Sequence, residues 1–479
     1  MKKLEGINIG DELKKAKALI EAEENLSPAL RAMLNMLLLI VRLMMNRLGM
    51  NSKNSSTSPS QDPNRKKKKA PPNPNKKPGG QNGRIGKRLD KVTDPDITHT
   101  LLLDKRTLPH GHVYTEAGYE TRQVFDIEIK RQIIEYRAQI LLDENGKKYV
   151  AAFPEEVRFD VQYGSAVKAH SVYMSQYQLI PYERVAHYFT QQMGLPLCVG
   201  TVFNFNKEAY DLLEAFERIA KTRLTGSALL HTDETGINVN QKRWWLHVAS
   251  NGFWTHYYPH QQRGAVATNE IGIVPQFKGV LCHDHWKPYY TFTKCLHSLC
   301  NAHHLRELTR AFEQDEQQWA EAMIKLLLAI KKAVDDSEAG ALNEVLCQQY
   351  QTQYLEILEA GKLECPLAPV VTTEKPKRGR LKQSKSRNLL DRLINYHEDV
   401  LRFMSNIDVP FTNNQAERDI RMTKVQQKIS GCFRSIEGAK IFCRVRGYLS
   451  TCGKHGVNMT EALSLLFKGK MPDFVYNSS

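Results

Sequence analysis

Residues 228–260 read ALLHTDETGINVNQKRWWLHVASNGFWTHYYPH, and they carry the clearest structural signals of the central part of the chain. Within it, Asn251-Gly252 separates two aromatic-rich runs, and Asn-Gly in that setting is a strong signal for a β-hairpin. Beyond it, a helix is predicted near residues 265–271, and the run FKGVLCHD at residues 277–284 predicts a further strand. Three antiparallel strands, a helix and another strand together predict a mixed α/β sheet.

Two aspartates lie at the expected carboxyl ends of strands in this sheet. Asp233 follows the apolar run at 228–232, and Asp284 follows the run at 277–283. α/β folds tend to place functional side chains at such positions, although aspartates there are also common turn formers and helix caps. Two carboxylates on neighbouring strands could share divalent metal ions, but a pair of ions needs a third carboxylate.

Glu417 is the candidate for that third carboxylate. Thr412 and Gln415 are spaced as a capping box, so Glu417 should lie in the first turns of a helix. Basic side chains follow on the same face at i+4, i+7 and i+11: Arg421, Lys424 and Lys428. An intrahelical salt bridge to Arg421 is the ordinary explanation of this pattern. An acid beside a basic stripe also suits a metal-bound phosphodiester whose neighbouring phosphates are held by Arg and Lys.

The composition is that of a soluble globular protein with an anionic partner. The chain has 479 residues, enough for about two to four domains, with 41% hydrophobic and 25% charged residues. Lys plus Arg total 67 against 52 Asp plus Glu, a formal net charge of +15. More than half of this excess lies in residues 62–91, whose densest basic run is Arg65, Lys66, Lys67, Lys68 and Lys69.

The N-terminal 95 residues divide into a helix and a linker. A heptad seam predicts a coiled coil over residues 28–50, with a helix buried in its own chain as the alternative; the seam consists of Leu30, Leu34, Leu37, Val41, Met44 and Leu48. The most apolar run, 33–45, is too short for a membrane span of about 20 residues, and the start lacks the features of a signal peptide. Residues 51–95 predict a disordered basic linker, which either contacts DNA phosphates or is merely solvated.

Two regions precede the central sheet. Alternating apolar residues in 112–163 predict a small sheet with a turn at residues 143–146. Residues 165–222 have helical periodicity, in which a helix from Tyr182, a turn at Gly194 and a second helix from Thr201 suggest a helix-turn-helix. Any helical hairpin gives the same pattern.

The cysteines predict reduced thiols rather than disulfides. Their number is nine, and they show no even, regularly spaced framework, as expected for a cytosolic protein. Cys295, Cys300, His303 and His304 place four potential zinc ligands within ten residues, but no second pair elsewhere completes a robust structural site. We expect instead that Cys300 is buried and that His303 or Arg306 lies near the rim of the acidic site.

Several of these segments together resemble the insertion sequence 66 family of transposases, which are DDE-type enzymes with a ribonuclease H-like catalytic core. The resemblance runs from about residue 28 to 468. Its matching segments, each followed by the number of its first residue, are NSKNSS (51), GGQNG (79), DETG (233), WLHVAS (245), GVLCHDHWKPY (279), CNAHHLREL (300), NNQAERDIR (413) and KISGCFRS (428).

The resemblance implies an α/β fold in which a mixed-sheet, ribonuclease H-like core carries an all-α insertion. The expected parts are an N-terminal helix or coiled coil (1–50), a disordered basic linker (51–95), a small β-rich module (96–164), a helix-turn-helix-like DNA-binding region (165–225), the first part of the core (226–300), the α-helical insertion (301–405) and the second part of the core with the C-terminal tail (406–479). Many relatives carry a zinc module after the Gly-Gly-Gln segment. Residues 92–197 contain no cysteine, so we expect no zinc there.

The resemblance also implies that Asp233, Asp284 and Glu417 are catalytic and bind two Mg²⁺ ions, with Mn²⁺ as an alternative. The expected reaction is cleavage at transposon ends followed by strand transfer into target DNA by transesterification. Expected DNA contacts come from Arg418, Arg421, Lys424 and Lys428, and from the basic run at residues 65–69.

The expected partners are double-stranded DNA, in the form of terminal inverted repeats and target DNA, a second copy of the chain, and accessory proteins of the same element. No membrane is expected, and the location would be the bacterial cytoplasm, at the nucleoid. The alternatives are a divalent-metal nuclease without joining activity and a non-catalytic protein that binds transposon ends.

Overall fold

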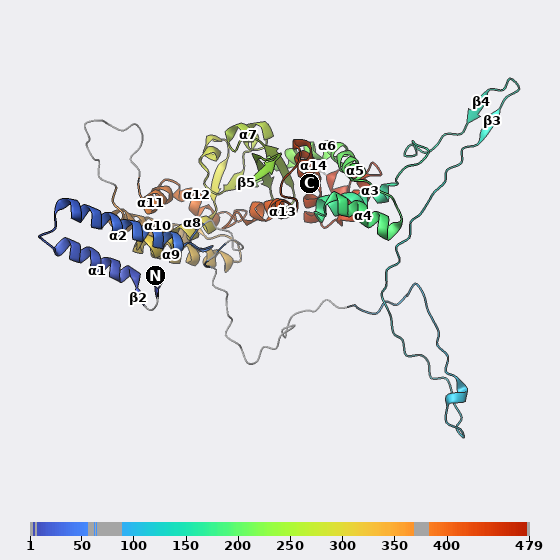
Figure 1. Ribbon diagram of the computed structural model, residues 1–479, viewed down its shortest axis with the longest axis horizontal. Helices are drawn as coiled ribbons and strands as arrows, with labels where there is room; N and C mark the ends of the chain where they lie inside the picture. Colours follow the sequence, from blue (N-terminus) through green and yellow to red (C-terminus); the bar gives the residue numbers. More distant parts are fainter. Residues whose placement is uncertain are drawn as a thin grey trace.

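The structure is a computed structural model that describes residues 3–4, 7–55, 62, 64, 89–367 and 383–476. The basic run Arg65–Lys69 and most of the predicted linker therefore lie outside the described residues. The described chain is elongated, with a central sheet flanked by one helical group at each side (Figure 1).

The centre of the molecule is a five-stranded mixed sheet with the strand order β7-β6-β5-β8-β9. Its strands are β5 (Leu229–Val239), β6 (Lys242–Ser250), β7 (Thr255–His260), β8 (Val280–His283) and β9 (Leu296–Leu299). β5, β6 and β7 are antiparallel, whereas β8 pairs in parallel with both β5 and β9. The predicted hairpin and fourth strand are confirmed, while β9 was not predicted.

Helices cover the sheet and enclose two apolar clusters. On β5, β6 and β7, α13 (Asn414–Ser430) and α14 (Ile436–Lys454) bury side chains such as Ile237, Leu246 and Phe442. The second cluster joins the sheet to α7 (Ala265–Ile271), α14 and α15 (Met459–Leu466) around Leu281 and Tyr448. The predicted helix at 265–271 is confirmed.

A helical group packs beside the β8–β9 edge of the sheet. It comprises α8 (Asn301–Asp315), α9 (Gln318–Asp335), α10 (Glu344–Glu364), α11 (Lys385–Asn395) and α12 (His397–Leu401). Its core includes Trp319, Met323 and Tyr354 and continues into the sheet through Val280 and Leu299. The helical character expected for residues 301–405 is confirmed for the described part of that range.

The helices of residues 165–225 lie on the other side of the sheet from the α8–α12 group. These are α3 (Ser165–Val172), a π-helical turn (Tyr173–Tyr177), α4 (Tyr182–Met193), α5 (Val199–Leu212) and α6 (Glu214–Thr225). Gly194 ends α4 with a φ of +58°, a backbone conformation that glycine adopts at low cost. The two predicted helices and the turn between them are confirmed, and their role in binding DNA stays a prediction.

Residues 89–163 project from this helical group as long extended arms (Figure 1). The small sheet predicted for 112–163 is wrong in extent, because it is limited to one hairpin of β3 (Ile140–Leu142) and β4 (Lys148–Val150). The turn between them lies at residues 143–146, as predicted. Val124, Ile127 and Ile133 are about 80–90% exposed, so within the described residues no strand or helix supplies the burial that would make their alternation a sheet.

The N-terminus forms a helical hairpin beside the α8–α10 group. A short strand pair, β1 (Lys3–Leu4) and β2 (Ile7–Asn8), precedes α1 (Ile9–Ala22), which packs on α2 (Pro28–Leu48). Ion pairs and hydrogen bonds at the end of α8 attach the hairpin, including Lys14 Nζ to Glu316 Oε2 at 3.1 Å and Asn54 Nδ2 to Glu313 Oε2 at 2.9 Å. The heptad pattern predicted a helix at α2, but no pattern predicted α1.

Helix α2 is longer than the most apolar run at residues 33–45 and contains all of it. Its 21 residues have a mean hydropathy of 1.6 in the most apolar window, and none of that window is buried. By length and composition it is the one helix of the described chain that could cross a membrane. A single helix of this kind near an N-terminus is weak evidence for a span, because soluble core helices and signal sequences have the same properties.

Candidate active site

Two of the predicted acids come together where β5 separates from β8. The parallel pairing of these strands ends with His231 opposite Cys282, and continuing the register by two residues places Asp233 beside Asp284. Asp284 directly follows β8, as predicted. Asp233 does not end its strand, because β5 continues to Val239 through antiparallel pairing with β6. The prediction of a strand end at Asp233 is therefore wrong.

The turn after β8 fixes the position of Asp284. The backbone N–H of Trp286 donates to Asp284 Oδ1 at 3.0 Å, and the N–H of His285 donates to His283 Nδ1 at 3.2 Å. His285 has a φ of +69°, which is uncommon and strained for a residue with a Cβ. The side-chain hydrogen bonds hold the chain in this sharp turn.

Asn413 attaches the start of α13 to β5. Its side chain is buried, its Nδ2 donates to the Thr232 carbonyl at 2.8 Å, and its Oδ1 lies 2.8 Å from His231 Nδ1. Its backbone N–H donates to Cys300 Sγ at 3.2 Å. These contacts bring Glu417, one turn further along α13, to the strand that carries Asp233.

The predicted capping box is wrong, although Glu417 does lie in the first turn of the helix. The residue that caps α13 is Asn413, and Gln415 bonds instead to Asp419, with 3.1 Å between its Nε2 and Oδ2. The side chain of Asn413 is committed to β5 rather than to the N–H groups of α13. Tertiary contacts therefore determine where the helix begins.

Glu417 faces α8. Its Oε1 lies 3.8 Å from His303 Nδ1 and 3.9 Å from Arg306 Nη2. Cys300 is buried, while His303 and Arg306 are partly exposed next to Glu417, so both expectations for these residues are confirmed. Among the described residues, neither His303 Nδ1 nor Glu417 Oε1 has a hydrogen-bond partner, although both atoms are buried.

The acids at this site influence one another electrostatically. Burial, followed by the nearby carboxylates of Glu234, Asp284 and Glu417, raises the pKa of Asp233 to about 8. Like charges crowded in this way are stabilised by a divalent cation, and carboxylate oxygens are the ligands that hard cations prefer. The crowding and the unpartnered Oε1 of Glu417 therefore fit a site for such ions.

Glu234 is a buried acid of this site that sequence analysis did not single out. Its side chain is 1% exposed, accepts a hydrogen bond of 2.6 Å from Arg263 Nε and accepts another of 2.8 Å from the Tyr289 hydroxyl. The Arg263 guanidinium in turn lies over the rings of Trp245 and Trp286. The available signal was a second acid directly after Asp233 in the same strand.

The basic residues of α13 differ in what they contact. Arg421 and Lys428 are exposed, and Arg418 Nη2 bonds to Gln415 Oε1 at 3.2 Å. Lys424 Nζ donates to the Gly236 carbonyl of β5 at 2.8 Å. Glu417 lies 3.8–3.9 Å from His303 and Arg306 of α8, and the described residues show no ion pair between Glu417 and Arg421, which was the ordinary expectation.

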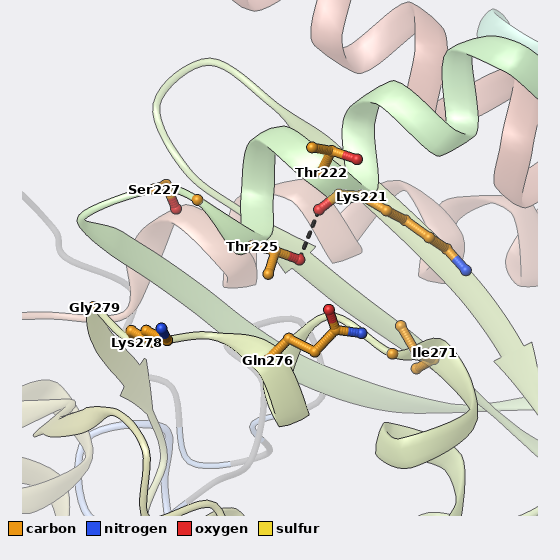
Figure 2. A pocket seen from close by; sticks show the side chains of 10 residues that line it. Lys221, Thr222, Thr225, Ser227, Ile271, Gln276, Lys278 and Gly279 are labelled. Atoms are coloured by element: carbon orange, nitrogen blue, oxygen red, sulfur yellow. Dashed lines mark hydrogen bonds between the residues drawn. The ribbon is translucent and has the colours of Figure 1, made fainter.

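An open pocket of about 660 Å³ lies at the opposite, amino ends of β5 and β8 (Figure 2). Its lining includes Lys221, Thr225, Ser227, Gln276, Lys278 and Gly279. None of the predicted site residues lines it. The pocket is therefore separate from the acidic site.

Comparison with known proteins identifies the family. A search of curated proteins finds no match to this chain. A family model described as Transposase IS66 family matches residues 160–441, which is more than half of the chain and includes the central sheet, the α8–α12 group and α13. The chain therefore belongs to the IS66 family of transposases, the family whose resemblance its sequence carries.

Proposed function

We propose that this transposase is a DDE enzyme that cleaves DNA at transposon ends and joins the freed 3′ ends to target DNA by transesterification. The observation that carries the proposal is the gathering of Asp233, Asp284 and Glu417 around the end of the β5–β8 pairing. They come from a strand, a turn and a helix, and burial together with the charges of Glu234, Asp284 and Glu417 raises the pKa of Asp233. Membership in the family supports a function in transposition and contact with DNA.

The topology supports a ribonuclease H-like catalytic core. Three antiparallel strands are followed by two strands that run parallel to the first, in the order β7-β6-β5-β8-β9. The α8–α12 group lies between β9 and α13 in sequence and would be the all-α insertion. This arrangement supports residues 226–300 and 406–479 as the two parts of the core, with 301–405 inserted between them.

Asp233, Asp284 and Glu417 would hold two divalent ions, Mg²⁺ or alternatively Mn²⁺, which would supply Lewis-acid stabilisation of charge at the scissile phosphate. The remaining tasks belong to the chain. Asn413 and the turn after Asp284 position two of the acids. Arg418, Arg421 and Lys428 on α13 would bind phosphates next to the scissile bond, as Arg and Lys commonly do.

Other parts of the chain would deliver DNA to this site. We propose that the helix-turn-helix-like helices α4 and α5 contact the terminal inverted repeat and that the basic run at 65–69 contacts phosphates. A second copy of the chain and accessory proteins of the same element are the other proposed partners. Action in the bacterial cytoplasm at the nucleoid follows from this function.

A strand-transfer assay tests the proposal. The substrate is a duplex that carries the inverted repeat found in the DNA flanking the gene, incubated with supercoiled plasmid and Mg²⁺. We expect cleavage at the repeat and insertion of the 3′ end into plasmid. Cleavage without insertion would favour the nuclease, and metal-independent binding without cleavage would favour the non-catalytic end-binding protein.

Replacing Arg65–Lys69 by glutamine should weaken binding to all duplex DNA alike. Each phosphate contact that is lost should lower the slope of log K against log salt by about 0.9. Salt titrations on transposon-end and random duplexes measure the slope, with Lys424→Ala as the comparison variant. Lys424 contacts β5 next to the acids, so its removal should mainly impair cleavage. Loss of discrimination between the duplexes by the glutamine variant would contradict the prediction.

Self-association through α2 gives another prediction. Leu37 and Met44 of the heptad seam are 51% and 59% exposed, so this seam is free to pair with a second copy. Leu37→Asp should weaken association at least about 100-fold, because each buried leucine contributes about 1.5–3 kcal/mol. Asn35→Asp, on the same helix but off the seam, is the control. Sedimentation that shows a monomeric wild-type chain would contradict the seam.

A further inference from the structure

A second kind of ligand set lies beside the acids. Within the described part of the chain, Cys300 Sγ, a ring nitrogen of His303 and a carboxylate oxygen of Glu417 all lie within 4.8 Å of one another. Ligand atoms around a tetrahedral Zn²⁺ are about 3.3–3.8 Å apart, given bonds of about 2.0–2.3 Å. The His303–Glu417 pair is already at 3.8 Å, so small side-chain rotations bring the set to that spacing.

The fold holds these three side chains in place. Cys300 is the N-cap residue of α8, and His303 follows three positions later, which puts both at one helix end. The Asn413 N–H bonds to the sulfur and connects α8 to the start of α13, where Glu417 lies. His303 Nδ1 and Glu417 Oε1 are buried and have no hydrogen-bond partner in the described part of the chain. Buried polar atoms without partners are rare, and two of them that face each other indicate a missing ligand.

We propose that Cys300, His303 and Glu417 form a binding site for a zinc-like divalent cation, with water as the fourth ligand. Thiolate and imidazole ligands select Zn²⁺, Co²⁺ and related ions, whereas Mg²⁺ prefers oxygen alone. Binding displaces the proton of the Cys300 thiol to solvent and leaves the oxidation states of metal and sulfur unchanged. The site differs from the proposed Mg²⁺ site in ligand chemistry but shares Glu417 with it.

Sharing Glu417 has a regulatory consequence, which rests on the proposed function. A cation bound to Cys300 and His303 occupies the carboxylate that the Mg²⁺ site needs, so zinc-like ions inhibit cleavage by competition. The two sites cannot be filled independently. The transposase is therefore active when Mg²⁺ predominates and inactive when zinc-like ions are available.

The ligand set differs from the one that the sequence spacing suggested. Cys295 Sγ bonds to the Phe292 carbonyl at 3.4 Å, and His304 Nδ1 lies 3.0 Å from Asn301 Oδ1, so both are engaged elsewhere. Three protein ligands make an open site rather than a closed structural one. We still expect no stoichiometric zinc in protein dialysed against chelator, and the site fills only when metal is added.

Titration of the chelator-treated, full-length chain with Co²⁺ tests the site without DNA. We expect the sulfur-to-cobalt charge-transfer band and the intense visible bands of tetrahedral Co²⁺. Cys300→Ser should lose the charge-transfer band, and His303→Ala should weaken Co²⁺ binding at least about tenfold. Cys295→Ser, which changes a buried thiol outside the set, should behave as wild type. Circular dichroism of each variant verifies folding.

Absence of the charge-transfer band in the folded wild type, or its persistence in Cys300→Ser, would overturn the site.

A parallel cleavage assay in Mg²⁺ compares each variant with and without added Zn²⁺, so every variant is its own reference. Zinc should inhibit the wild type, and Cys300→Ser should need at least about tenfold more. Equal inhibition of both would overturn the regulation. A Co²⁺ site in a chain that never cleaves DNA would instead reject the proposed function and leave the site standing.

Discussion

Asp233→Asn, Asp284→Asn and Glu417→Gln are each expected to lower cleavage and strand transfer by at least about 10³-fold, or about 4 kcal/mol of transition-state stabilisation. Each change removes one carboxylate from the site proposed to hold the divalent ions and alters the side-chain volume little. The measurement is the rate of 3′-end formation on a transposon-end duplex in Mg²⁺.

The three substitutions should lower the rates of cleavage and strand transfer without affecting folding or binding of the transposon end. Thermal unfolding and transposon-end binding of the three variants should remain close to wild type, because none of the three acids contributes to the buried apolar clusters. Glu307→Gln is the matched control, since Glu307 lies on α8 near the site but pairs with Arg392 through two hydrogen bonds of 2.9 Å. It should retain most of the rate. Near wild-type transposition by any one acid variant would remove that residue from the proposed catalytic set.

Gly279→Ala is expected to destabilise the chain by about 3 kcal/mol or more. A Cβ at Gly279 would lie 2.3 Å from the Ala228 carbonyl oxygen and 2.7 Å from the Ser227 carbonyl oxygen. Both are backbone atoms directly before β5, and the Ala228 oxygen also accepts a hydrogen bond from the Val280 N–H. The methyl group can fit only if the strands move apart.

Gly236→Ala is the control for this prediction. Gly236 lies in β5 of the same sheet, but there a Cβ would meet the guanidinium of Arg243, the far end of a flexible side chain. Urea unfolding should therefore show a much smaller loss for Gly236→Ala. Equal stability of both variants would show that the amino ends of β5 and β8, which border the pocket in Figure 2, are not closely packed.

Much of the core follows from local sequence. The hairpin at Asn251-Gly252, helix α7 and strand β8 all agree with the patterns that predicted them. In each case the signal lies within about ten residues: a turn pair, a helical period or an apolar run. The departures occur where tertiary contacts replace local preference, as at Thr412, whose capping role falls to Asn413.

In the extended arms, residues 89–163, a local sequence pattern was not enough to predict the structure. Val124 and Ile133 alternate as strand residues do, yet they are exposed, since alternation produces a sheet only when one face is buried. The short strand β9 was missed for a related reason. Its four residues carry too little pattern, and β9 forms because β8 offers a parallel edge.

The hairpin, the helical character of residues 301–405, the three candidate acids and the family resemblance could all be predicted from short contiguous segments of sequence. Which side chains lie together at the site depends instead on how the elements pack. Asn413 joins α13 to β5, Glu234 lies beneath Arg263, and Glu417 meets Cys300 and His303. These contacts link residues more than a hundred positions apart or on different elements. A local sequence pattern cannot predict contacts between residues so far apart in the chain. These contacts form only when the sheet and the helices pack together.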